Sequence, residues 1–129
     1  MEVGSFCWWN SPEKPTNQLC LIITSEDDES FALCCDADIR LAGHFDVIMS
    51  MGETGLPFVI TVLTHVARWI SNDELSASTG KVSANDLAEI EGARAGYKPK
   101  SLITGRLLLC PELEPRWPMI QKRARKFLD

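Results

Sequence analysis

The feature that most constrains the fold is a pair of short apolar segments separated by a charged turn. Residues 18–24 (QLCLIIT) and 31–35 (FALCC) are almost wholly apolar, and the six residues between them include four acids, Glu26, Asp27, Asp28 and Glu29. Apolar runs of this length bounded by polar turn residues are typical of buried strands. We therefore predict that the two segments form an antiparallel pair.

Three further segments have strand character. Residues 45–51 (FDVIMSM) alternate between two faces, which favours a strand with one covered face. Residues 101–110 (SLITGRLLLC) are predicted to be a strand, and residues 5–9 (SFCWW) form a short apolar run before a proline-containing loop at 10–17. The total is four or five strands.

Residues 56–71 give conflicting signals. Seven of them are β-branched, which favours a strand. Their larger aliphatic side chains, however, recur at helical intervals without strict alternation, and Pro57 suits a first helical turn. Burying five aliphatic side chains contributes roughly 1.5–3 kcal/mol each, more than the propensity penalties of a few tenths. We therefore predict a core helix here.

Two more helices are expected. Ser83 precedes Asp86 at the spacing of a capping box and opens a short helix that ends near Gly96. Residues 116–128 form a basic final helix. The predicted fold class is α+β: a mainly antiparallel sheet of four or five strands packed against a core helix, in a single domain 1–129 with a basic C-terminal helix at 115–129.

Composition narrows the class of protein. Of the 129 residues, 45% are hydrophobic and 24% charged, with a net charge of −5, as in an ordinary globular domain. The N-terminus resembles no signal peptide and no apolar stretch could span a bilayer, so we expect a cytoplasmic protein without membrane partners. The five cysteines include no C-x-x-C pair, so we expect packing rather than a metal site, and no cofactor.

No residue pattern in the sequence indicates a particular catalytic reaction. The two histidines, His44 and His65, have no sequence context that places them beside a nucleophile. Asp36, Asp38 and Asp46 could supply paired carboxylates, but their spacing singles out no pair. A small hydrolase or nuclease using Asp36, Asp46 and His44 stays open as an alternative.

Residues 45–113 resemble the suppressor-of-fused domain family. The resemblance rests on residues 45–49 (FDVIM), the Leu56-Pro57 dipeptide, residues 62–69 (VLTHVARW), residues 102–109 (LITGRLLL) and the closing Pro-Glu-Leu at 111–113. Leu56 stands where the family has Trp, and residues 96–99 (GYKP) replace its Gly-His. The resemblance implies a mixed α/β fold with a helix over residues 62–69. It also implies a protein that binds other proteins, as immunity-type members do with a toxin.

Charge placement suggests which surface a partner would meet. Residues 26–53 contain eight acids and one base, and residues 116–129 five bases and one acid. We expect a non-enzymatic immunity-type protein that occludes a basic toxin through an acidic surface with a tryptophan anchor. This expectation assumes that a helix at 56–71 leaves no reactive pocket. The predicted partner-binding residues are Trp8, Trp9, Glu26, Asp27, Asp28, Glu29, Asp36, Asp38 and Asp46.

A second alternative is an accessory protein that binds nucleic acid through its final helix. The bases concerned are Arg116, Lys122, Arg123, Arg125 and Lys126. The overall acidic charge makes nucleic acid an unlikely main partner.

Overall fold

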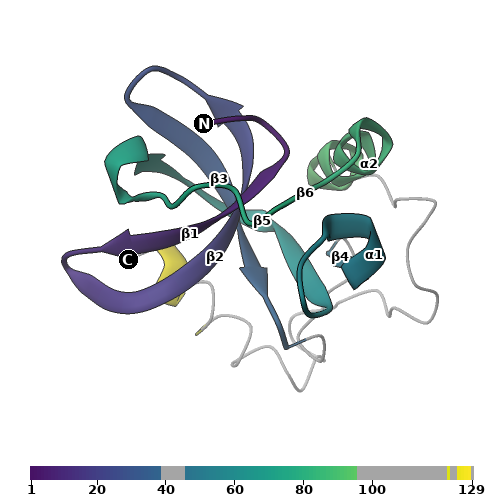
Figure 1. The fold of residues 1–129 in the computed structure, drawn as a ribbon, viewed down its shortest axis with the longest axis horizontal. Coiled ribbons are helices and arrows are strands. Elements are labelled where there is room, and N and C mark those ends of the chain that lie inside the picture. The colour runs from purple at the N-terminus through teal and green to yellow at the C-terminus, as the bar shows by residue number, and fades with distance from the viewer. Residues whose placement is uncertain (39–45, 96–121, 123–124, 129) are drawn as a thin grey trace.

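A computed structural model describes residues 1–38, 46–95, 122 and 125–128. Its elements follow one another along the chain (Figure 1) as β1 (Ser5–Ser11), β2 (Lys14–Ser25), β3 (Glu29–Asp36), β4 (Val47–Met49), α1 (Met51–Thr54), β5 (Ile60–Ser71), the 3-10 helix η2 (Asn72–Glu74), β6 (Gly80–Lys81) and α2 (Ala84–Arg94). The fold is α+β as expected, but the described part already contains six strands rather than four or five. The predicted strand at 101–110 lies outside the described residues.

All six strands form one antiparallel sheet in the order β4-β5-β3-β2-β1-β6. The predicted pairing of the first two apolar segments is confirmed, with Cys20 opposite Cys34 and Leu21 opposite Leu33. The loop expected at 10–17 is shorter than predicted. β1 and β2 extend into it and leave only Pro12 and Glu13 between them.

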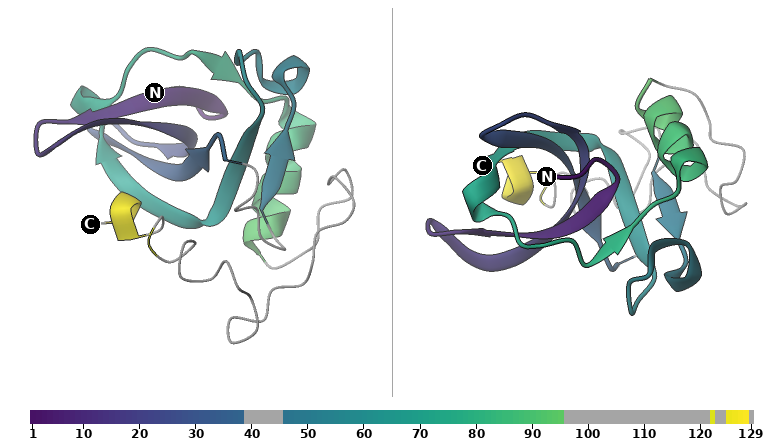
Figure 2. Two further views of the ribbon diagram at one scale, coloured as in Figure 1. Left: turned by 90° about the horizontal axis from the view of Figure 1, so that it is seen from below. Right: turned by 45° about the horizontal axis from the view of Figure 1, so that its top comes forward.

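The sheet buries both of its faces. Along β2, Leu19, Leu21 and Ile23 enter one apolar cluster, whereas Cys20 and Ile22 enter another. The first cluster packs against α2 through Ile90 and Ala93. The second cluster is closed by Phe127, in the helical residues 125–128 near the C-terminus. That short helix and α2 lie at opposite ends of the curled sheet (Figure 2).

The predicted core helix at 56–71 is wrong, because Ile60–Ser71 is the long strand β5, extended between β3 and β4. Five consecutive residues from Ile60 to Thr64 are buried, so both faces of the strand are covered and no polar alternation marks it. The helix that the family resemblance implies at 62–69 is likewise a strand. Because residues 60–71 are a strand, there is no core helix at 56–71 to exclude a reactive pocket.

An irregularity of three residues interrupts the pairing of β5 with β3 and divides β5 into two halves. We call it the bulge. Leu33 pairs with Ala67 and the next residue of β3, Cys34, pairs with Leu63, so the pairing register with β3 skips residues 64–66. Two side chains from outside β5 bond to the buried backbone of Thr64. Its N–H donates to Asp46 Oδ1 over 3.3 Å, and its carbonyl accepts from Arg94 Nε over 3.1 Å. These two side-chain hydrogen bonds therefore hold the backbone of the bulge in place.

Short helices occupy the remaining connections. Met51, predicted as the last residue of a strand, instead begins α1, with Ser50 and Glu53 in a reciprocal capping box. The strand β6 passes directly over α1. A Cβ atom on Gly80 would lie 2.6 Å from the Thr54 carbonyl oxygen, so only glycine fits. The predicted Ser83 cap of α2 is confirmed, with its hydroxyl accepting from the Asp86 N–H.

Candidate functional site

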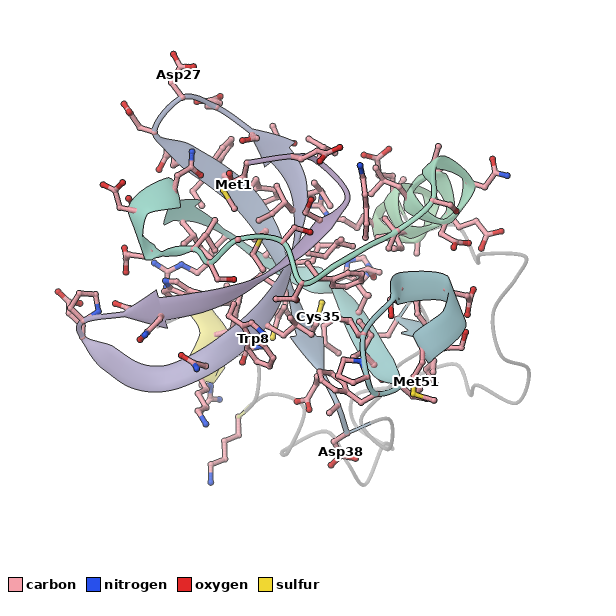
Figure 3. All side chains as sticks on the ribbon, in the orientation of Figure 1. Met1, Trp8, Asp27, Cys35, Asp38 and Met51 are labelled. Atoms are coloured by element: carbon pink, nitrogen blue, oxygen red, sulfur yellow. The ribbon has the colours of Figure 1, made fainter. Side chains whose placement is uncertain are left out.

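The four acids of the β2–β3 turn project from one end of the sheet. Glu26, Asp27, Asp28 and Glu29 are all exposed, and Asp27 lies at the tip of the hairpin in Figure 3. Within the part of the chain that the structure describes, their carboxylates make no ion pair or hydrogen bond. They are therefore available to an external partner.

Asn72, the first residue of η2, forms hydrogen bonds with the backbone of this turn. Its side-chain amide donates to the carbonyl oxygens of Glu26 and Asp27 at 3.2 and 3.3 Å, and its backbone N–H donates to the Asp28 carbonyl at 2.9 Å. The Ser30 hydroxyl donates to Asn72 Oδ1 at 2.6 Å. These bonds occupy the backbone and leave the acidic side chains pointing outward, so the turn is ordered before any partner arrives.

The other predicted acids lie elsewhere. Asp36 is the last residue of β3, and Asp38 comes two residues later. Because β3 spans eight residues, both acids lie roughly 25 Å from the turn. Asp36 Oδ1 accepts the Asp38 N–H at 2.9 Å, which shapes the local chain. The acids predicted to bind a partner are therefore divided between the two ends of β3.

The structure describes two of the three residues of the alternative hydrolase site, Asp36 and Asp46. Asp36 pairs in register with Thr61 on the β3 side of β5, and Asp46 Oδ1 accepts the Thr64 N–H within the bulge. Both acids thus flank the same stretch of β5, and at least Asp46 has a structural role. His44 lies outside the described residues.

The tryptophan anchor is placed differently from the prediction. Trp9 is buried in the second cluster, and Trp8 is half-buried against the first. Among the three tryptophans that the structure describes, the exposed one is Trp69 near the end of β5, where 39% of the residue is accessible. Strand alternation would have turned it outward between Arg68 and Ile70, but the helical interpretation of this segment concealed that signal.

A hollow of about 460 Å³ lies beside Trp69, between the tip of the β1–β2 hairpin and the end of β5. Arg68 forms part of its wall, with its guanidinium carbon 4.6 Å from the centre of the Trp9 ring. Among the described lining residues the ionisable side chains are one base, Arg68, and three acids, Glu13, Asp73 and Glu74. The hollow and the acidic turn are neighbours, since Ser71 in its wall pairs with Glu29. Among their described lining residues, the hollow and the turn together carry more acids than bases.

The described cysteines are packing residues, as expected. Cys7, Cys20, Cys34 and Cys35 are buried in the two apolar clusters, while Cys110 lies outside the described residues. In the described ranges no group of three metal-ligating side chains converges. No helix there is long and apolar enough to cross a membrane.

Comparison with known proteins gives a likeness of fold. Neither a family model nor a curated relative matches the sequence. Among solved structures, a chain from an endoribonuclease in complex with its cognate antitoxin, from a mycobacterial species, superposes with a TM-score of 0.57. The match covers 74% of this chain and 90% of that one at 17% sequence identity. The protein thus shares the fold of a chain found in a toxin–antitoxin complex.

Proposed function

We propose that this protein is a non-enzymatic inhibitory partner that binds and occludes a basic protein, as one member of a toxin–antitoxin-type pair. The acidic β2–β3 turn carries the proposal. Four outward carboxylates, unpaired within the described chain, stand on a turn that Asn72 holds in place. The likeness of fold to a chain from an endoribonuclease–antitoxin complex supports the same kind of pairing.

The charge of the turn suits a basic protein surface. Exposed carboxylates contribute mainly to the association rate and to partner choice, and their effect falls with ionic strength. Because the turn is already ordered, binding costs little loss of loop entropy.

The test is co-expression of the full chain with each protein encoded next to it, with growth as the first readout. A partner whose toxicity the chain relieves is then purified, and the dissociation constant of the complex is measured from 50 to 300 mM NaCl. We expect affinity to fall as salt rises. Failure of every neighbouring product to bind, or an affinity indifferent to salt, would contradict the proposal.

Two matched double variants test whether the partner contacts the β2–β3 turn. Asp27→Asn with Asp28→Asn removes two charges from the turn, and Asp86→Asn with Glu91→Gln removes two from α2. We expect the turn variant to weaken the complex about tenfold, which corresponds to about 1.4 kcal/mol, and the α2 variant to stay within twofold. Equal weakening by both would show that only net charge matters.

The comparison also favours a second candidate, an endoribonuclease, because that enzyme is named in the matched complex. Incubating the purified chain with single-stranded RNA tests it directly. Cleavage that Asp36→Asn or Asp46→Asn abolishes would establish the enzyme and overturn the non-enzymatic proposal. Intact RNA, together with relief of a partner's toxicity, is the expected result.

A further inference from the structure

Three cysteines stand in one row across the sheet. Cys7 on β1 lies opposite Cys20 on β2, and Cys20 lies opposite Cys34 on β3. All three are fully buried in the second cluster, so their side chains share one face of the sheet. Cys35, the next residue of β3, enters the first cluster on the other face. Cys20 therefore has one cysteine beside it on each neighbouring strand.

The direction of the backbone groups distinguishes these two neighbours of Cys20. In an antiparallel sheet the N–H and C=O of one residue point to the same adjacent strand, and this direction alternates along the strand. The Phe6 and Trp8 carbonyls point away from β2, since they accept N–H groups from the segment between η2 and β6 at 2.8 and 2.9 Å. Cys7, which lies between them, therefore directs its N–H and C=O to β2 and forms a hydrogen-bonded pair with Cys20.

It follows that Cys20 and Cys34 form a non-hydrogen-bonded pair. Cys20 directs its backbone groups to β1, as does Ile22 two residues later, whose carbonyl accepts the Gly4 N–H at 2.7 Å. Cα atoms lie about 4.5 Å apart in a non-hydrogen-bonded pair and about 5.5 Å apart in a hydrogen-bonded pair, with the side chains closer in the former. A disulfide needs Cβ atoms roughly 3.5–4.5 Å apart. Cys34 is therefore better placed than Cys7 to form a bond with Cys20.

The short helix near the C-terminus covers the cluster that contains this pair. Of residues 125–128 only Phe127 is buried, and it belongs to the same cluster as both cysteines. In the right-hand view of Figure 2 this helix lies within the curve of the strands. Short terminal segments open locally at lower cost than the strands of a core. Local detachment of this helix would therefore open the cluster while the sheet stays paired.

We propose that Cys20 and Cys34 are a redox pair, which a small disulfide such as oxidised glutathione converts to a disulfide bond between β2 and β3 when Phe127 withdraws. One cysteine thiolate attacks a sulfur of the small disulfide, forms a mixed disulfide and releases one small thiol. The other cysteine thiolate attacks the protein sulfur of the mixed disulfide and releases the second small thiol. Two protein thiols are thus oxidised, one small disulfide is reduced, and the two protons end on the released thiols.

The new bond would close the β2–β3 hairpin below its acidic turn. Cys20 precedes the turn and Cys34 follows it, and both lie in the paired part of the hairpin. The proposal concerns the core of the sheet and does not depend on the proposed function. A chain that relieves no toxicity can still form the bond, and a chain that binds a toxin can lack it.

The test is oxidation of the full native chain by oxidised glutathione at pH 8, followed by blocking of the remaining thiols, cleavage after glutamate and mass spectrometry. Cleavage after glutamate separates peptide 14–26, which contains Cys20, from peptide 30–53, which contains Cys34 and Cys35. We expect these two peptides to be joined, and to separate on reduction. The absence of joined peptides, or a dominant bond from either peptide to any other cysteine, would overturn the proposal.

The two adjacent cysteines of β3 provide a matched control. Cys34→Ala should abolish the bond between the peptides, and Cys35→Ala should retain it in at least three quarters of the chains. An unfolded chain in urea would join Cys20 to either cysteine in similar yield, so only the folded sheet distinguishes them. Fragmentation of the joined peptides from the unaltered chain gives the same assignment without a substitution. Equal yields from the two native variants, or a bond from Cys20 to Cys35, would overturn the pair.

The rate of oxidation tests the cover. Phe127→Ala should oxidise at least fivefold faster than the unaltered chain, whereas Leu128→Ala, which alters an exposed residue of the same helix, should stay within twofold. The faster product should still join Cys20 to Cys34, because the sheet itself stays paired. Equal rates in the two variants would overturn the role of Phe127 as the cover.

Discussion

Removing the Phe127 ring should destabilise the protein far more than its place near the chain end suggests. Its residue is only 1% exposed, and its ring meets that of Trp9 edge to face, with centres 5.6 Å apart and an angle of 76°. Truncating a buried phenylalanine to alanine typically costs about 3–5 kcal/mol. Because the short terminal helix can detach instead of leaving a cavity, we expect the low end, about 3 kcal/mol.

The assay is urea unfolding of Phe127→Ala followed by far-ultraviolet circular dichroism and tryptophan fluorescence. A loss of 3 kcal/mol should lower the melting temperature by roughly 10–15 °C in a chain of this size. The matched control is Leu128→Ala, since Leu128 is the next residue in the same helix and is 47% exposed. The control should lose less than about 0.5 kcal/mol.

A red shift of tryptophan emission in the native Phe127→Ala protein would show that Trp9 has lost its cover. If the free energy of unfolding of Phe127→Ala falls within 0.5 kcal/mol of the Leu128→Ala value, the terminal helix does not close the second cluster. The account of a sheet with two buried faces would then be refuted.

Two other perturbations test the packing and the thiols. Gly80→Ala should lower the free energy of unfolding by more than about 1 kcal/mol, because its Cβ would lie 2.6 Å from the Thr54 carbonyl oxygen. Gly92→Ala in α2 meets nothing within 4 Å and should raise the free energy of unfolding by about 0.5–1 kcal/mol. Thermal melts of both variants check this, and equal effects would contradict it. Burial raises the pKa of the Cys7 thiol, so above pH ~8.5 the unfolded chain loses this proton before the folded one does. The free energy of unfolding should therefore decline between pH 8 and 10, and an equally steep decline in Cys7→Ala would assign the effect to other groups.

Some of the fold could be predicted because its signals are local. The β2–β3 hairpin follows from two apolar runs around a turn of acids, and the start of α2 follows from Ser83, whose hydroxyl can satisfy a free N–H of the first helical turn. The acidic turn, which is the candidate contact surface, was visible for the same reason. Each of these elements depends on residues within a few positions of one another.

The elements that could not be predicted depend on distant contacts. β5 has no alternation because both its faces are covered, and its bulge at 64–66 shifts the period of the apolar side chains partway along. A helical spacing then arises by coincidence. The hollow brings together residues that are far apart in the sequence, such as Glu13 and Asp73. No short sequence pattern could therefore predict it.

The two apolar clusters also define regions that need not open together. Along β5, Ile60 and Val62 enter the cluster under α2, whereas Leu63 and Ile70 enter the cluster closed by Phe127. Local opening usually follows the boundaries between such packed units. Amide hydrogens of the short helix at 125–128 should therefore exchange with solvent through a partial opening that detaches this helix, while those near Ile60 should exchange only on complete unfolding.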